Sequence, residues 1–249
     1  PTTTDWLHLN DVDVISEDRY LVSIRNANQI LIIERGEGVV DVINEDHDDG
    51  DDWSCDRGGQ LADTDGDGDV RCGSHLVLNH QHNPHWLGDG AVLVADSHND
   101  RVVELHRNES GHWNPVWTVQ SAGGIRFDWP RDADRLPNGN TLITDTLKKR
   151  IVEVNESGHV VWSYTTEYVP YEADRLPYAE STPVPLFDGN VTDPVQEPPS
   201  DVPVLSTMLL GLKAVWSGIP YWFTETQLFL VLVGVGTMAV GGVLRWRDR

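Results

Sequence analysis

The chain has 249 residues, a formal net charge of −22 at pH 7 and a sequence pI of about 4.5. This length allows one or two domains, and so negative a protein would repel phosphate, which argues against a nucleic-acid partner. Abundant Asp and Glu with only three lysines (Lys148, Lys149 and Lys213) indicates a halophilic protein, because concentrated salt screens self-repulsion. An ordinary acidic protein is the alternative.

Residues 1–180 show the alternation of apolar and polar residues that is typical of β-strands. A strand–turn–strand unit at residues 18–33 recurs at 90–105 and again at 139–154, and a fourth copy begins near Tyr171 and stops. A repeat of roughly 40–50 residues with about four strands is typical of a β-propeller blade. We therefore expect an all-β fold with three blades and a partial fourth, out of a six-bladed propeller.

A closed propeller needs about four to eight blades. We therefore expect further blades to be supplied by a part of the protein that precedes Pro1, or by a partner chain. The interval between the first two copies is longer than the next because it contains an acidic insertion, residues 46–75.

The insertion suggests two features. One is a Ca²⁺ loop, since carboxylates alternate with Thr or Gly at Asp63, Asp65, Asp67 and Asp69. A solvated acidic loop is the alternative, and no cofactor is expected for catalysis. The other is a disulfide between Cys55 and Cys72, which would close the loop if this domain lies outside the cell.

The C-terminal part divides into four segments. Proline and acidic residues predict a stiff, disordered stalk at 181–203. Residues 204–223 are predicted to lie on a membrane surface, with a second spanning helix over 204–218 as the alternative. Residues 226–244 carry no charge and predict a transmembrane helix. Residues 245–249 then form a short tail.

The membrane orientation follows from the charges beside this helix. Arg245, Arg247 and Arg249 predict a cytoplasmic C-terminus, so the propeller of a single-pass protein would be extracellular. Three possible glycosylation sites agree with that side of the membrane, at Asn108, Asn155 and Asn190.

The repeat places residues of different blades at equivalent radial positions. One equivalent set differs in type from blade to blade and comprises Asn10, His82, Arg131 and Tyr171. A second comprises Asp11, Asn83, Asp132 and Glu172, and a third, mostly acidic, comprises Asp13, His85, Asp134 and Asp174. The first set suggests one asymmetric site on the propeller axis. The third is expected to make structural hydrogen bonds between blades.

The axial candidates are donors and cations in an otherwise acidic protein, and they suit an anion such as sulfate or phosphate. They are His8, Asn10, Arg25, His80, His82 and Arg131. A neutral histidine among them could attack as a nucleophile. The rival interpretation is a zinc or copper site, because His80 and His82 share one face of a strand.

Motifs at residues 5–13, 22–25, 81–84 and 129–142 resemble those of the arylsulfate sulfotransferase family, and the resemblance extends over about residues 5–178. It is strongest toward archaeal, membrane-anchored members. The family transfers sulfate between phenolic compounds through a sulfohistidine, without a nucleotide sulfate donor. The resemblance therefore implies a small aryl sulfate and a phenol as substrates.

Carried over to this chain, the resemblance makes His82 the nucleophile and His8 a second catalytic residue. Substrate-binding roles fall on Asn10, Arg25, His80 and Arg131. The family has a further active-site histidine in an earlier blade, which this chain does not contain. A non-catalytic extracellular propeller that binds a protein or glycan, and a histidine–metal redox propeller, remain the alternatives.

Overall fold

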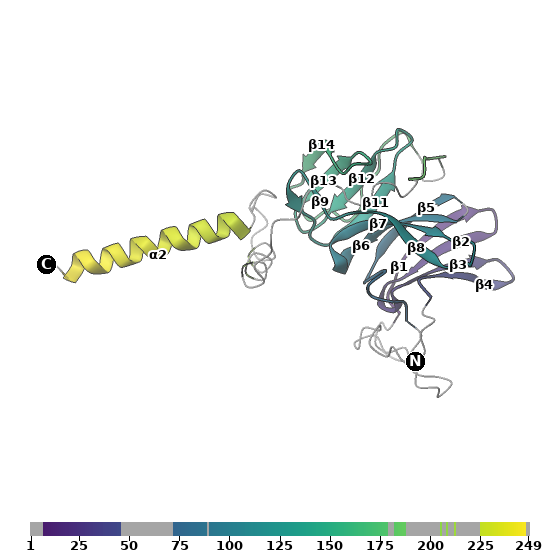
Figure 1. Cartoon of the computed structure of the whole chain (residues 1–249), viewed down its shortest axis with the longest axis horizontal. Coiled ribbons are helices and arrows are strands. Elements are labelled where there is room, and N and C mark those ends of the chain that lie inside the picture. Colours follow the sequence, from purple (N-terminus) through teal and green to yellow (C-terminus); the bar gives the residue numbers. More distant parts are fainter. Residues whose placement is uncertain are drawn as a thin grey trace, which may run out of the picture.

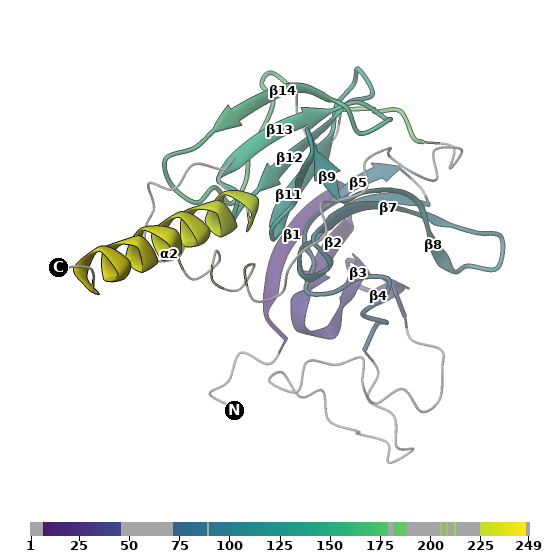
Figure 2. The same ribbon diagram turned by 60° about the vertical axis from the view of Figure 1, so that its left-hand side comes forward.

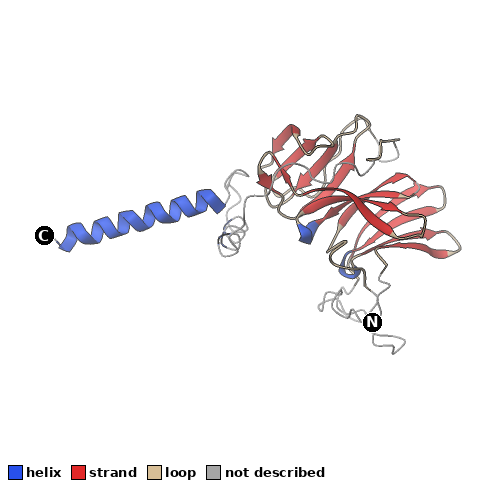
Figure 3. Cartoon of the chain, viewed as in Figure 1, coloured by secondary structure: helices blue, strands red, loops and turns tan. Residues whose placement is uncertain are grey.

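The computed structural model describes residues 7–45, 72–88, 90–178, 182–187 and 225–247, together with residues 205, 208 and 212. Strands dominate this part of the chain (Figure 3). They form three four-stranded antiparallel sheets and one short two-stranded ladder.

Each four-stranded sheet is a simple meander in which every strand pairs with the next one along the chain. We call the sheets blades 1, 2 and 3. Blade 1 contains β1 (Leu9–Ser16), β2 (Arg19–Ile24), β3 (Gln29–Glu34) and β4 (Gly38–Ile43). Blade 2 contains β5 (His82–Gly88), β6 (Ala91–Asp96), β7 (Arg101–Arg107) and β8 (Trp113–Val119). Blade 3 contains β11 (Pro130–Arg135), β12 (Thr141–Asp145), β13 (Arg150–Val154) and β14 (Val160–Thr165).

Shorter elements connect and extend the blades. The ladder between blades 2 and 3 pairs β9 (Ser121–Ala122) with β10 (Ile125–Arg126). Single 3₁₀ turns, η1 (Arg25–Ala27) and η2 (Ser97–Asn99), follow β2 and β6. The helix α2 (Glu225–Arg247) lies near the C-terminal end of the chain (Figure 1).

Blade 2 lies between the other two, and the first strands of the three blades come together. β5 contacts both β1 and β11, as Figure 2 shows. In β6, Val92 and Val94 pack toward blade 1, whereas Leu93 packs toward blade 3. A strand covered on both faces has no solvent side, so the run from Ala91 to Ala95 is continuously apolar instead of alternating.

The expectation of an all-β protein built of propeller blades is confirmed for these three sheets. The fourth copy differs from a blade: residues 171–178 form no strand. The segment lies beside β11 in space: the Ala173 backbone N–H donates to Asp132 Oδ2 at 2.9 Å. A single extended segment without three partner strands cannot build a sheet of its own.

Part of the predicted stalk packs against the blades. Phe187 is buried, and its backbone N–H donates to Glu104 Oε1 at 3.1 Å. The Pro185 carbonyl accepts from Arg135 Nη1 at 3.2 Å. Residues 182–187 are therefore held by a buried charged pair, which the proline-rich composition did not reveal.

The prediction of a membrane-spanning helix at 226–244 finds no support. α2 covers these positions, yet no helix within the described residues is both long and apolar enough to cross a membrane. A span needs about 20 consecutive apolar residues.

Most of the acidic insertion, residues 46–71, lies outside the described residues. The four aspartates of the predicted Ca²⁺ loop and Cys55 belong to this segment. The sequon residue Asn190 also lies outside the described residues. Cys72 is described: it is buried and disulfide-bonded. The chain has two cysteines in all.

Candidate functional site

The loops that lead into the first strands share an unusual backbone conformation. His8, His80 and Trp129 occupy equivalent repeat positions and have φ of 47°, 49° and 57°. Two of these loops are held by the preceding blade. The His80 N–H, ahead of blade 2, donates to Asn28 Oδ1 of blade 1 at 3.0 Å, and the Trp129 N–H, ahead of blade 3, donates to Asp100 Oδ1 of blade 2 at 2.9 Å. These junctions fix the start of each first strand relative to its neighbours.

His82 is the first residue of β5, and its side chain is buried at the meeting point of the first strands. Its Nδ1 lies 2.8 Å from Ser97 Oγ and 3.1 Å from the His80 carbonyl oxygen. Burial, followed by the positive charges of Arg131 and Arg25, lowers the pKa of His82 to about 3. The imidazole is therefore uncharged at neutral pH, with a lone pair on one nitrogen.

An aromatic and cationic wall lies next to His82. The Arg131 guanidinium stacks on Trp129 and on Tyr171, 4.5 Å and 4.9 Å from the two ring centroids. The Tyr171 ring meets the His82 ring edge to face, with centroids 5.9 Å apart. Among the described residues, Arg131 Nε and Trp129 Nε1 are buried donors without a hydrogen-bond partner. Two such donors suit an anionic ligand.

The other predicted ligand residues are held by contacts of their own. Asn10 Nδ2 donates to the Gln81 carbonyl at 2.8 Å, while Asn10 Oδ1 is buried without a partner in the described structure. Arg25 Nη1 donates to Asn26 Oδ1 at 2.7 Å. His8 contributes through its charge, which lowers the pKa of His82.

His80 and His82 do not share a ligand-binding geometry. His80 Nδ1 lies 2.9 Å from His98 Nδ1, so one of the two rings donates and the other accepts. Among the residues the structure describes, no group of three or more His, Cys, Asp or Glu side chains is arranged to hold a metal ion. The metal alternative therefore finds no site in the described part of the chain.

His85 belongs to the structural hydrogen bonds. Its Nδ1 accepts from the Arg135 backbone N–H at 3.1 Å and lies 3.4 Å from Asp134 Oδ1. These contacts join blade 2 to blade 3. They fit the expectation that the third equivalent set bonds between blades.

Below the wall, the second and third equivalent sets line an acidic cavity of about 210 Å³. Burial raises the pKa of Asp11 to about 6 and that of Asp132 to about 7. Asp132 Oδ2 also accepts from Thr144 Oγ1 at 3.3 Å. The first strands thus carry cationic and aromatic groups at one level and carboxyl groups at the next.

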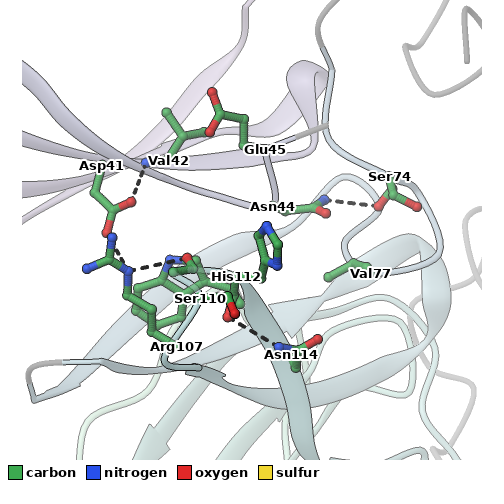
Figure 4. Close-up of a pocket in the computed structure, with 12 residues that line it drawn as sticks. Asp41, Val42, Asn44, Glu45, Ser74, Val77, Arg107, Ser110, His112 and Asn114 are labelled. Atoms are coloured by element: carbon green, nitrogen blue, oxygen red, sulfur yellow. Dashed lines mark hydrogen bonds and ion pairs between the residues drawn. The ribbon is translucent and has the colours of Figure 1, made fainter. Parts of the chain in front are cut away.

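A second cavity, of about 530 Å³, lies between the outer strands of blades 1 and 2 (Figure 4). Within it, Arg107 Nε lies 3.5 Å from Asp41 Oδ2, and the same atom donates to the Gly111 carbonyl at 3.3 Å (Figure 4). Its lining comes from β4, from Arg107 at the end of β7, from the turn that follows and the start of β8, and from Ser74 and Val77 ahead of β5. The cavity is therefore separate from the His82 site.

The sequons at Asn108 and Asn155 lie in equivalent hairpin turns. Asn108 is exposed, and its Oδ1 accepts from the Ser110 and His112 backbone N–H groups at 2.9 and 3.0 Å. Asn155 Oδ1 accepts from the His159 N–H at 3.0 Å. In both turns the side-chain oxygen stabilises the turn.

Four neighbours of the site were not among the predicted catalytic or binding residues, namely Ser97, His98, Trp129 and Tyr171, although Tyr171 stood in the first equivalent set. The repeat contained a signal for three of them. Trp129 is equivalent to His8 and His80, Tyr171 to His82, and Ser97 to Arg25. The contact of His98 with His80 could not be read from the repeat, since it depends on the course of the η2 turn.

A search of curated proteins finds no match to this chain. Solved structures with a similar fold include the WD40 β-propeller domain of Doa1, with 11% identity, a TM-score of 0.43, and coverage of 67% of this chain and 44% of that one. Another is virginiamycin B lyase from Staphylococcus aureus, with 12% identity, a TM-score of 0.37, and coverage of 66% and 43%. Kuenenia stuttgartiensis hydrazine synthase has 12% identity, a TM-score of 0.41, and coverage of 69% and 40%.

The chain spans less than half the length of these solved structures, and the similarity carries no functional argument. The family comparison is more informative. The model of one family, described as arylsulfotransferase (ASST), matches residues 2–167, which include all three blades and the whole His82 site except Tyr171. The chain belongs to the arylsulfotransferase family.

Proposed function

We propose that this protein transfers a sulfuryl group from an aryl sulfate ester to a phenolic acceptor, with His82 as the covalent carrier. One observation supports this most directly: a buried histidine with a pKa of about 3 lies within the field of two arginines. A histidine that attacks a sulfate ester must be unprotonated, and its surroundings must stabilise the negative charge of the substrate.

In the first half-reaction, the lone pair of His82 attacks sulfur. The N–S bond forms as the S–O bond to the aryl group breaks, and the phenolate leaves with the electron pair and takes up a proton from water. In the second, the oxygen of an acceptor phenol attacks the same sulfur, the electron pair of the N–S bond returns to the imidazole, and the proton of the phenol goes to water. The exchange needs no oxidant, reductant or nucleotide.

The surroundings of His82 fit both parts of an aryl sulfate. Arg131 and Arg25 supply positive charge for the sulfuryl oxygens, and the buried Arg131 Nε and Trp129 Nε1 are donors in need of acceptors. Tyr171 and Trp129 offer ring faces and edges for an aromatic substrate.

The test is turnover of a phenyl sulfate donor with a phenol acceptor by the full chain. We expect His82→Ala to lower the rate by about 10³-fold or more, since the covalent route is lost, and ³⁵S label from the donor to stay on the wild-type protein but not on the variant. His112→Ala, at an exposed position of the outer cavity, is the matched control. Full turnover by His82→Ala would refute His82 as the carrier, and no turnover by the wild type would favour a binding propeller.

A further inference from the structure

We propose that Ser97 is a positioning residue: it holds His82 in the tautomer that carries its proton on Nδ1, so that Nε2 is the attacking nitrogen. The catalytic consequence of this assignment rests on the proposed function. The tautomer itself does not, because it follows from the hydrogen bonds around the two side chains.

The hydroxyl of Ser97 has one proton to donate. Its oxygen lies 2.6 Å from the Pro130 carbonyl oxygen and 3.5 Å from that of Ala95. A carbonyl can only accept, so the short contact commits the Ser97 proton to Pro130. The lone pairs of Ser97 Oγ are then left for His82 Nδ1, at 2.8 Å.

His82 Nδ1 therefore meets two acceptors, Ser97 Oγ and the His80 carbonyl oxygen. Both contacts are favourable only if Nδ1 carries the proton. In a neutral imidazole the other nitrogen, Nε2, then keeps the lone pair. The low pKa of His82 is consistent with a ring that stays neutral in this form.

His85, three residues further along β5, shows the opposite arrangement. Its Nδ1 accepts from the Arg135 N–H, so a neutral His85 carries its proton on Nε2. Two histidines of one strand are thus held as different tautomers by their partners. His85 accepts a hydrogen bond at Nδ1 from the neighbouring blade, whereas His82, the proposed nucleophile, donates from Nδ1 to Ser97.

Ser97 also spans the junction between blades 2 and 3. It follows β6, contacts His82 on β5 and donates to Pro130, the first residue of β11. Arg131 follows Pro130 directly. One hydroxyl therefore fixes the nucleophile relative to the strand that carries the arginine.

The Nδ1–H has a role during transfer as well. When Nε2 bonds to sulfur, the ring gains positive charge, and the proton on Nδ1 stays in place. Ser97 Oγ and the His80 carbonyl then stabilise that charge as acceptors. No additional proton acceptor is needed at this step.

The repeat supplies a matched control. Thr146 is the residue of blade 3 equivalent to Ser97, its side chain is buried, and its hydroxyl has no hydrogen-bond partner among the described residues. Thr146→Val removes a hydroxyl of similar burial without touching His82. Ser97→Thr keeps a hydroxyl at the proposed position.

The experiment is ¹⁵N NMR of the imidazole of His82 in the full chain, combined with kinetics on a phenyl sulfate. We expect the wild type, Ser97→Thr and Thr146→Val to show the Nδ1–H tautomer, and Ser97→Ala to show a mixture of the two. We expect kcat of Ser97→Ala to fall roughly 10-fold or more with little change in KM, since the ring loses one of the two acceptors that fix its tautomer.

An unchanged tautomer in Ser97→Ala would overturn the proposal, whatever the kinetics show. A tautomer shift in a protein whose wild type has no turnover would support the assignment while refuting the proposed function. The two failures are therefore distinguishable.

Discussion

At the scale of single residues, the site combines a neutral nucleophile with nearby positive charge. Burial is the first cause of the low pKa of His82, and Arg131 is the second. The unfolded chain takes up a proton on this histidine near pH 6.5, whereas the folded chain does so only near pH 3. Between these values the unfolded state binds more protons, so this residue lowers the stability of the folded protein as pH falls below 6.5.

Replacing Arg131 tests this electrostatic coupling. We expect Arg131→Gln to raise the pKa of His82 above about 3, because a positive charge next to the imidazole is removed. An NMR titration of His82 measures this directly. Arg107→Gln, which removes a cation from the outer cavity, should leave the pKa of His82 unchanged. Equal shifts in both variants would show that the effect is general and not local.

At the scale of elements, the turn after the second strand of blades 1 and 2 holds the loop that leads into the next blade. Asp100 sits at the C-terminal end of η2 with φ of 51°, and its side chain accepts from the Trp129 N–H at 2.9 Å. Asn28, at the equivalent position of blade 1, also has a positive φ, and its side chain accepts from the His80 N–H. Asp and Asn suit this position for two reasons: they tolerate the left-handed conformation, and they carry an acceptor.

Two substitutions separate these reasons. We expect Asp100→Ala to lower the free energy of unfolding by roughly 1–3 kcal/mol, since the half-buried Trp129 N–H loses its acceptor and alanine is strained at positive φ. Asp100→Asn keeps the acceptor and the conformation and should not lower the free energy of unfolding. Urea unfolding measures both. A small cost in both variants would contradict the role of this junction.

The pH dependence of the same residue has a defined sign. Burial raises the pKa of Asp100 to about 6. The folded state therefore binds more protons than the unfolded state between about pH 4 and 6, and the stability contributed by the protonated form is lost as pH rises through that window. We expect Asp100→Asn to be more stable than the wild type at pH 8, and the difference to shrink near pH 4. Thermal unfolding at the two pH values checks this.

At the scale of the whole molecule, one buried ion pair joins three separate parts of the chain. Arg135 of blade 3 donates from Nη2 to Glu104 Oε2 of blade 2 at 2.8 Å, with both side chains fully buried. Glu104 also accepts from the Phe187 N–H, and the Arg135 guanidinium lies 3.3 Å from the Phe187 ring centroid. The segment 182–187 is thereby docked on the two blades.

Breaking this pair on one side should be costly. We expect Glu104→Gln to lower the free energy of unfolding by about 3 kcal/mol, because the charge of Arg135 stays buried without its partner. The double variant Glu104→Leu with Arg135→Met should recover much of that loss, since neither member of the pair leaves an unpartnered charge buried. Urea unfolding measures both, and a single variant as stable as the wild type would refute the account.

The sequence by itself determined the blades, because the alternation of apolar and polar residues and the repeat can be read along the chain without knowing which segments pack together. It also determined which positions lie near the axis, since equivalent strands place equivalent residues at equal radius. His82, Arg131 and Arg25 were found in this way, and the electrostatic contacts join all three. The family match to residues 2–167 agrees with the motifs that the sequence shows.

Only the tertiary structure decided the partners. The stretch from His80 to His85 looks uniform, yet His80 contacts His98, His82 contacts Ser97, and His85 accepts from Arg135. Two of these partners follow β6, and the third lies in another blade. Neither their distances nor the direction of each hydrogen bond is encoded in local spacing, because both depend on how the blades pack. That packing gives each of the three histidines a different partner.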